Sequence, residues 1–211
     1  MLIIRKEKES DWQRVEEITR KAFYNIYVPG CMEHYLVHVM RHHEDFISEL
    51  DLVAELDGQV IGNIMYTKAR LTDEKGEEKE ILTFGPISIL PEYQRMGYGK
   101  RLMEESFARA IELGYDVIVI FGSPANYVGQ GFVSCKKQNI CAENGTFPAA
   151  MLVKTLREGA LDGRKWYYRE SPAMQIDETE ARRYDDGLEK LEKAWRPSQE
   201  EFYILSNSLI Q

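Results

Sequence analysis

The sequence ILTFGPISILPEYQRMGYGKRLM, residues 81–103, joins three local patterns in a fixed order. An apolar, β-branched run over 81–90 predicts a strand, and a polar loop with Gly97 and Gly99 follows it. Apolar side chains at three- and four-residue spacing then predict a helix over 100–113. Glycines allow a ligand to approach the backbone closely, and the first amides of a helix lie unpaired at the positive end of its dipole. The stretch therefore predicts an anion site suited to phosphate.

Three glycine-rich phosphate motifs can be compared with this loop. A P-loop fails because Arg101 stands where the motif needs Ser or Thr, and because Gln94 stands where it needs its first Gly. A dinucleotide-binding GxGxxG fails because Leu102 replaces its third Gly and the preceding strands have an antiparallel pattern. The third motif, [QR]-x-x-G-x-[GA], is matched in full by Gln94, Gly97 and Gly99.

This third motif resembles the pyrophosphate loop of the GNAT superfamily of N-acetyltransferases. Segment 85–93, which ends in Pro-Glu-Tyr, is similar to the fourth strand of that family. Segment 127–132 resembles its Tyr-x-x-x-Gly-Phe signature, and 122–125 forms the Gly-x-Pro-Ala turn of one group of predicted bacterial members. The expected order of elements also agrees, and the resemblance covers about residues 2–156.

The resemblance implies an α/β (α+β) fold with a mixed, mostly antiparallel sheet flanked by helices. The sheet is expected to splay between strand 81–90 and a buried strand over 116–121, and acetyl-CoA is expected in that gap as co-substrate. The pantetheine arm would pair with the first strand, and the loop amides would hold the pyrophosphate, with positive charge from Lys100 and Arg101 beside it. The implied cofactor-binding residues are Ile87, Ser88, Ile89, Gln94, Arg95, Met96, Gly97, Tyr98, Gly99, Lys100 and Ser123.

The resemblance also implies transfer of the acetyl group to a primary amine by direct attack, with Tyr127 as general acid toward the leaving thiolate. An ordinary phenol, with a pKa of ~10, suits a thiol with a pKa of ~8.5. No general base is marked, and Glu33, Glu80 and Glu92 stay open as alternatives. Covalent transfer through Cys135 is a rival mechanism without an evident activating partner. The alternative function is a non-catalytic acyl-CoA-binding sensor on the same fold. A sensor has less need of Tyr127, so the presence of this residue favours the enzyme.

A helix is expected over 32–46, and four histidines lie within a ten-residue stretch of it: His34, His38, His42 and His43. Such a ladder is typical of a solvated helix face. Recognition of the acceptor amine is a second interpretation and metal binding a third. Because no carboxylate–histidine motif accompanies them, no metal site is predicted.

Composition sets the class of protein. The chain has 211 residues, with 27 basic and 35 acidic side chains and a net charge of −8, which argues against a nucleic-acid partner. Three cysteines outside any CxxC argue against a disulfide framework or a structural zinc. No signal peptide and no run of about 18 apolar residues is evident, so we expect a cytoplasmic protein without membrane contact. A small-molecule or peptide amine is the expected partner.

The chain divides by character into a core over 1–156 and a C-terminal extension over 157–211. A charged helix is expected over 178–193, followed by an apolar tail, and these could pack on the core or form a homodimer. Residues 166–169 are a candidate for one more strand on the acceptor side.

Overall fold

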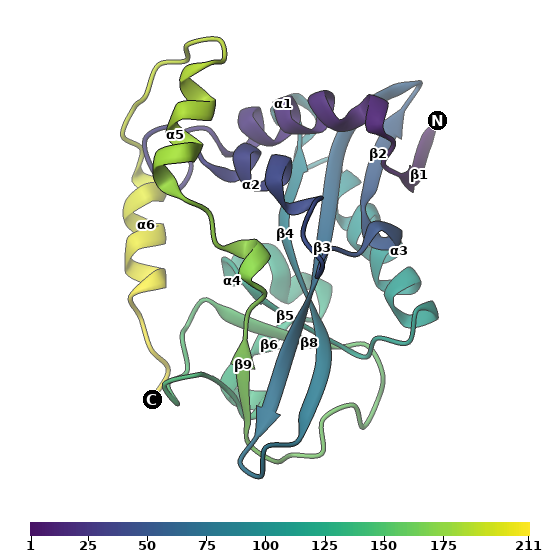
Figure 1. The fold of residues 1–211 in the computed structure, drawn as a ribbon, viewed down its shortest axis with the longest axis vertical. Coiled ribbons are helices and arrows are strands. Elements are labelled where there is room, and N and C mark those ends of the chain that lie inside the picture. The colour runs from purple at the N-terminus through teal and green to yellow at the C-terminus, as the bar shows by residue number, and fades with distance from the viewer.

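The computed structural model describes all 211 residues and contains nine strands and six helices (Figure 1). The strands are β1 (Leu2–Lys6), β2 (Leu52–Leu56), β3 (Gln59–Asp73), β4 (Glu78–Ile89), β5 (Val117–Phe121), β6 (Val133–Ser134), β7 (Ile140–Ala142), β8 (Met151–Thr155) and β9 (Trp166–Arg169). The helices are α1 (Trp12–Phe23), α2 (Glu33–Met40), α3 (Tyr98–Glu112), α4 (Pro124–Tyr127), α5 (Glu178–Asp186) and α6 (Pro197–Ser206). None of these helices combines the length and the apolar composition needed to cross a bilayer.

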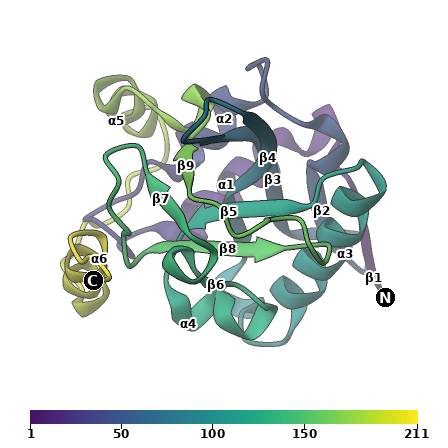
Figure 2. The same cartoon turned by 90° about the horizontal axis from the view of Figure 1, so that it is seen from below.

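One sheet holds all nine strands and confirms the expected mixed α/β class. Its order is β1-β2-β3-β4-β5-β8-β6, with β9 pairing to β3 and β7. Only the β4–β5 and β7–β9 pairs are parallel. Helices α1 and α2 cover one face of the sheet, and α3 and α4 cover the other, as seen on the two sides of β5 and β8 in Figure 2.

Strands β4 and β5 meet at a single pair of residues, Leu82 and Ile118, and then separate. Just beyond this pair the register between β3 and β4 shifts, because Met65 of β3 lies opposite both Gly85 and Pro86 of β4. An extra residue of this kind bends a strand and increases its twist. The bulge therefore accompanies the point at which β4 leaves β5 and opens the expected gap in the sheet.

Helix α2 ends at Met40, six residues earlier than the expected end at residue 46. Phe46 instead forms a bridge with Thr67, and the Ile47 amide donates to the Tyr66 carbonyl at 3.1 Å. The apolar side chains that suggested a longer helix are thus used to extend the sheet beside β3. Tertiary pairing overrides the helical spacing here.

The C-terminal extension contributes to the sheet and then forms two helices. β9 occupies the expected residues 166–169 and pairs with β3 from Arg70 to Asp73. The single helix expected over 178–193 is wrong, because α5 ends at Asp186 before Gly187 and α6 starts at Pro197. Residues 187–196 are not helical, and Pro197 suits the first turn of α6.

Helix α5 is attached to α1 and α2 through a buried carboxylate. Asp185 accepts a hydrogen bond from Arg20 Nε at 2.8 Å, and its Oδ1 lies 3.3 Å from His34 Nε2. His34 Nδ1 lies 3.3 Å from Cys31 Sγ, and the His34 side chain is fully buried. Burial lowers the pKa of His34 to about 4, so the ring is neutral at pH 7.

This histidine makes the stability of the protein depend on pH. Below pH 6.5 the unfolded chain binds a proton at His34 that the folded chain binds only near pH 4, so stability is complete above pH 6.5 and falls as pH decreases toward 4. We expect the free energy of unfolding to decrease by about 2–3 kcal/mol less in His34→Gln than in wild type between pH 6.5 and 4, as measured by urea unfolding. The exposed His42→Gln is the control, and an unchanged pH dependence in His34→Gln would contradict the argument.

Candidate active site

The loop between β4 and α3 presents a row of unpaired backbone amides. No protein atom accepts a hydrogen bond from the six N–H groups of residues 95–100, whereas Arg101 N–H donates to Gly97 O at 3.1 Å and begins the helical ladder. Arg95 and Gly97 both have positive φ, 60° and 87°, which turns successive amides toward one side. The loop therefore has the backbone form of an anion site at a helix N-terminus.

The side chains of this loop add little charge to the site. Lys100 Nζ points along the helix to Glu104 Oε1 at 3.7 Å, and Met96 is 65% exposed. Gln94 Nε2 donates to the Ile89 carbonyl at 2.9 Å and so fixes the loop against the end of β4. The anion-binding character comes mainly from the backbone.

Near the end of β4, the backbone groups of two residues face the gap. Leu90 N–H donates to Ile61 O of β3, and hydrogen-bonding direction alternates along an antiparallel strand, so Ser88 also directs its backbone to β3. Ile87 and Ile89 then direct their backbone groups to the open side. Ser88 Oγ is buried and donates to Thr19 Oγ1 at 3.1 Å. Ile87 and Ile89 are better placed than Ser88 to pair with an extended ligand.

Tyr127 is the last residue of α4, the short helix that follows β5, and its ring lies beside Gly122 and Phe84. Its ring packs between Phe84 and Phe132, at centroid distances of 5.8 and 5.7 Å, and its hydroxyl forms no hydrogen bond with the protein. A Cβ on Gly122 would lie 2.5 Å from Cε2 of Tyr127, so only glycine leaves room for the ring here. Burial, followed by the nearby Tyr27, raises the pKa of Tyr127 above that of an ordinary phenol. The hydroxyl keeps its proton at neutral pH and holds it more tightly than the ordinary phenol that was expected from the sequence.

Two other sequence candidates have simple surroundings. Ser123 precedes α4 without a capping hydrogen bond from its side chain, which leaves its hydroxyl free near the end of β5. Cys135 is buried, its thiol faces the Pro148 carbonyl at 3.5 Å, and burial raises its pKa to about 11. A buried thiol of this kind is a poor nucleophile, which disfavours covalent transfer.

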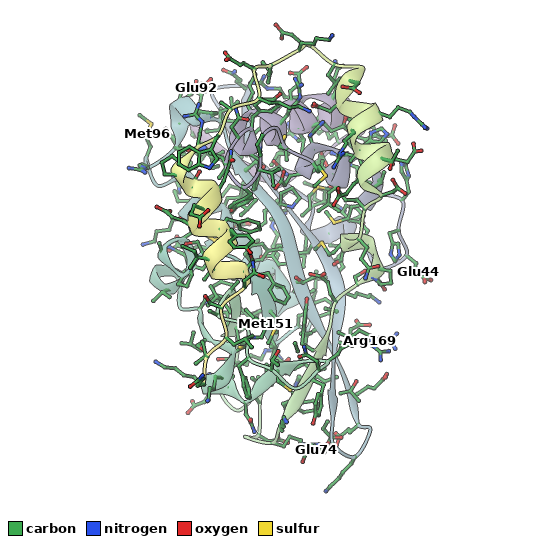
Figure 3. The ribbon with its side chains drawn as sticks, turned by 90° about the vertical axis from the view of Figure 1, so that its left-hand side faces the viewer. Glu44, Glu74, Glu92, Met96, Met151 and Arg169 are labelled. Carbon is green, nitrogen blue, oxygen red and sulfur yellow. The ribbon has the colours of Figure 1, made fainter.

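On the opposite side of the gap, the α1–α2 loop meets the last helix. Tyr27 packs on Phe202 of α6 at 4.6 Å between centroids, and Ser198 Oγ donates to the Ile26 carbonyl at 2.8 Å. Burial and the charge of Glu33 both raise the pKa of Tyr27. Figure 3 shows α6 in front of the sheet, between the loop that carries Met96 and the start of β8. The extension thus helps to wall this side of the molecule.

Residues 168–174, here called the crossing segment, lie over the same side and were not singled out as site residues by the sequence. The Tyr168 ring lies 6.0 Å from that of Phe121, the last residue of β5, and Met174 Cε lies 4.0 Å from the Cβ position of Gly85 in the β4 bulge. The segment therefore runs from the end of β5 to the bulge of β4. The alternation of buried Trp166 and Tyr168 was the available signal.

The four histidines have separate partners. His34 belongs to the buried Asp185 cluster, His38 Nδ1 lies 3.1 Å from Glu16, and His42 packs edge-on against Trp12. His43 Nδ1 accepts from the Asp45 amide. Their side chains therefore support the packing of α1, α2 and the following turn.

The chain is similar in sequence and in fold to known proteins. The model of the acetyltransferase (GNAT) family matches residues 12–135. The uncharacterized N-acetyltransferase YhbS of Escherichia coli K12 is 30% identical over 164 residues, which cover 77% of this chain and 92% of YhbS. The crystal structure of E. coli YhbS in complex with CoA has a TM-score of 0.70 at 25% identity, covering 82% of this chain and 91% of that one.

A second similar structure is that of a GNAT family acetyltransferase from Brucella melitensis in complex with acetyl-CoA. Its TM-score is 0.64 at 25% identity, and the match covers 83% of this chain and 99% of that one. Family model, sequence relative and splayed sheet agree: the chain belongs to the GNAT family of N-acetyltransferases.

Proposed function

We propose that the protein transfers the acetyl group of acetyl-CoA to the primary amine of a small molecule or peptide. The observation that carries this proposal is the row of six unpaired amides at residues 95–100, beside the gap between β4 and β5. The similar structures from E. coli and B. melitensis are complexes with CoA and acetyl-CoA, respectively. A gap with an anion site at one end fits a ligand with a pyrophosphate and a long amide-bearing arm.

The residues of the gap divide the binding of this ligand among themselves. The amides of residues 95–100 would hold the pyrophosphate, with Gln94 closing the loop. The backbone of Ile87 and Ile89 would pair with the amides of the pantetheine arm, as an added strand pairs with a sheet edge. Ser123 would contact the ligand from the end of β5.

Tyr127 would act at the reacting end. Bound acetyl-CoA supplies an acetyl thioester, and the neutral amine attacks its carbonyl carbon. The C–N bond forms, the C–S bond breaks, and the amine nitrogen releases one proton. Tyr127 would donate its proton to the departing sulfur and regain one from solvent. A sensor on the same fold would not need such a proton donor. The free hydroxyl of Tyr127 therefore favours an enzyme over a sensor.

The anion site can be tested by thermal unfolding. A ligand at about a hundredfold excess over its Kd stabilises the folded state by about 2.7 kcal/mol, so acetyl-CoA should raise Tm by several degrees. Gly97→Glu should abolish this shift, because it adds bulk and negative charge where the pyrophosphate binds. Gly58→Glu is the matched control, since Gly58 has φ +86° against +87° at Gly97 and equally open surroundings, but lies in the β2–β3 hairpin. An equal shift in Gly97→Glu and the control would disprove the loop assignment.

The role of Tyr127 is tested by Tyr127→Phe, which keeps the ring packing on Phe84 and Phe132. We expect kcat to fall about 100-fold, while KM for acetyl-CoA and the acetyl-CoA-dependent Tm shift stay unchanged. The rate is followed as acceptor-dependent release of free thiol. Unchanged kcat would remove Tyr127 from the mechanism.

A further inference from the structure

We propose that Glu170 binds the acceptor, and that the acceptor is a small cationic amine with no carboxylate next to its amino group. This inference rests on the proposed function, because it concerns the amine side of the same gap. Glu170 lies in the C-terminal extension, outside the residues 12–135 that match the family model.

The position of Glu170 follows from its neighbours on the crossing segment. Tyr168, two residues before it, packs on Phe121 at the end of β5, and Met174, four residues after it, contacts Gly85 in the β4 bulge. The first contact is with β5 and the second is with β4, the two strands that border the gap. The carboxyl of Glu170 therefore lies in the part of the chain that spans the gap on the face opposite α3.

The environment of Glu170 is short of positive charge and of hydrogen bonds. Its side chain is half-buried, forms no hydrogen bond or ion pair, and burial raises its pKa. The hydroxyl of Tyr168 is buried without a hydrogen-bond partner, and burial, together with the smaller effect of the Glu170 charge, raises the pKa of this hydroxyl. The crossing segment thus carries an unpartnered hydroxyl at Tyr168 and an unpartnered carboxyl two residues later at Glu170.

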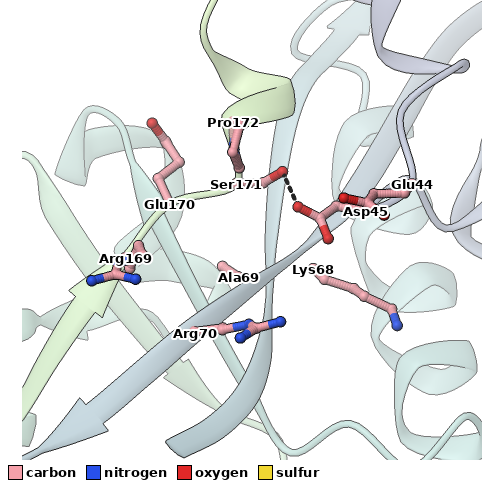
Figure 4. A pocket seen from close by; sticks show the side chains of 9 residues that line it. All are labelled: Glu44, Asp45, Lys68, Ala69, Arg70, Arg169, Glu170, Ser171 and Pro172. Atoms are coloured by element: carbon pink, nitrogen blue, oxygen red, sulfur yellow. Dashed lines mark hydrogen bonds between the residues drawn. The ribbon is translucent and has the colours of Figure 1, made fainter.

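Nearby cations are already paired with other acids. Glu170 lines a polar cavity of about 220 Å³, and Figure 4 shows its side chain pointing away from Lys68 and Arg70, which also line the cavity. Lys68 lies 3.3 Å from Glu80, Arg70 lies 3.2 Å from Glu78, and Arg169 lies 2.9 Å from Glu143. No side chain of the protein neutralises Glu170.

A half-buried carboxylate without a counterion stabilises a bound cation and repels an anion. The acceptor binds as an ammonium ion, which supplies the missing charge. In a monoamine the same nitrogen then loses a proton and attacks the thioester as the neutral amine. An α-amino acid brings its own carboxylate close to Glu170, so it should bind less well. The charge therefore selects amines such as aryl- or hydroxyalkylamines and diamines over amino acids.

The test uses matched acceptors with the full-length protein. Tyramine is compared with tyrosine and ethanolamine with serine, since each pair differs by one carboxylate, and putrescine serves as a diamine. Wild type should prefer the amine of each pair. Glu170→Gln should raise KM for the amines and lower kcat/KM about tenfold, with KM for acetyl-CoA unchanged. Glu44→Gln, an exposed carboxylate beside the same cavity, is the control and should behave as wild type.

Three results would overturn the assignment. One is equal kcat/KM for Glu170→Gln and wild type with every amine used. Another is a wild-type preference for tyrosine and serine. The third is no turnover of tyramine, ethanolamine or putrescine by a protein that acetyl-CoA still stabilises. That last result would leave cofactor binding intact, whereas absence of any acetyl-CoA effect on Tm would instead contradict the proposed function.

Discussion

The separation of β4 from β5 is the constraint on which the rest of the site depends. A parallel pair that continued past Leu82 and Ile118 would satisfy the backbone of both strands and leave no place for a ligand. The bulge at Gly85 and Pro86 accompanies the separation on the β3 side. It leaves the backbone of Ile87 and Ile89 directed to an open edge, where β4 runs on into the loop before α3.

Backbone geometry rather than side-chain charge defines the cofactor side. The chain has a net charge of −8, and Lys100 points to Glu104 rather than into the loop. Six consecutive amides nevertheless stay without a protein acceptor, in a loop that contains two residues with positive φ and runs directly into a helix. Such a site is insensitive to the identity of most loop side chains and sensitive to Gly97.

The sequence was most informative where local pattern and local structure coincide. The strand–loop–helix over 81–103, the sheet class and β9 at 166–169 could be read from periodicity, from glycine positions and from the resemblance to a family. Helix ends were wrong at Phe46, where pairing with Thr67 competes with the helix, and in the charged stretch, where α5 ends before Gly187. Ser88 has the same strand pattern as its neighbours, and only the register shows that it faces β3.

The acceptor side is built from segments far apart in the chain, which is why sequence patterns said least about it. The α1–α2 loop contacts α6 through Tyr27 and Phe202, and the crossing segment contacts the end of β5 through Tyr168 and Phe121. No short motif joins these segments. Under the proposed function, one continuous stretch would bind the cofactor and the extension would contribute to binding the acceptor. Differences between relatives in the extension would then change the acceptor without changing the cofactor.

A crystal structure of the protein with acetyl-CoA would show how the cofactor is bound. We expect pyrophosphate oxygens within hydrogen-bonding distance of the amides of residues 95–100, and the pantetheine arm paired with the backbone of Ile87 and Ile89. A cofactor bound elsewhere, or a pyrophosphate held by side chains while these amides stay unpaired, would contradict this expectation.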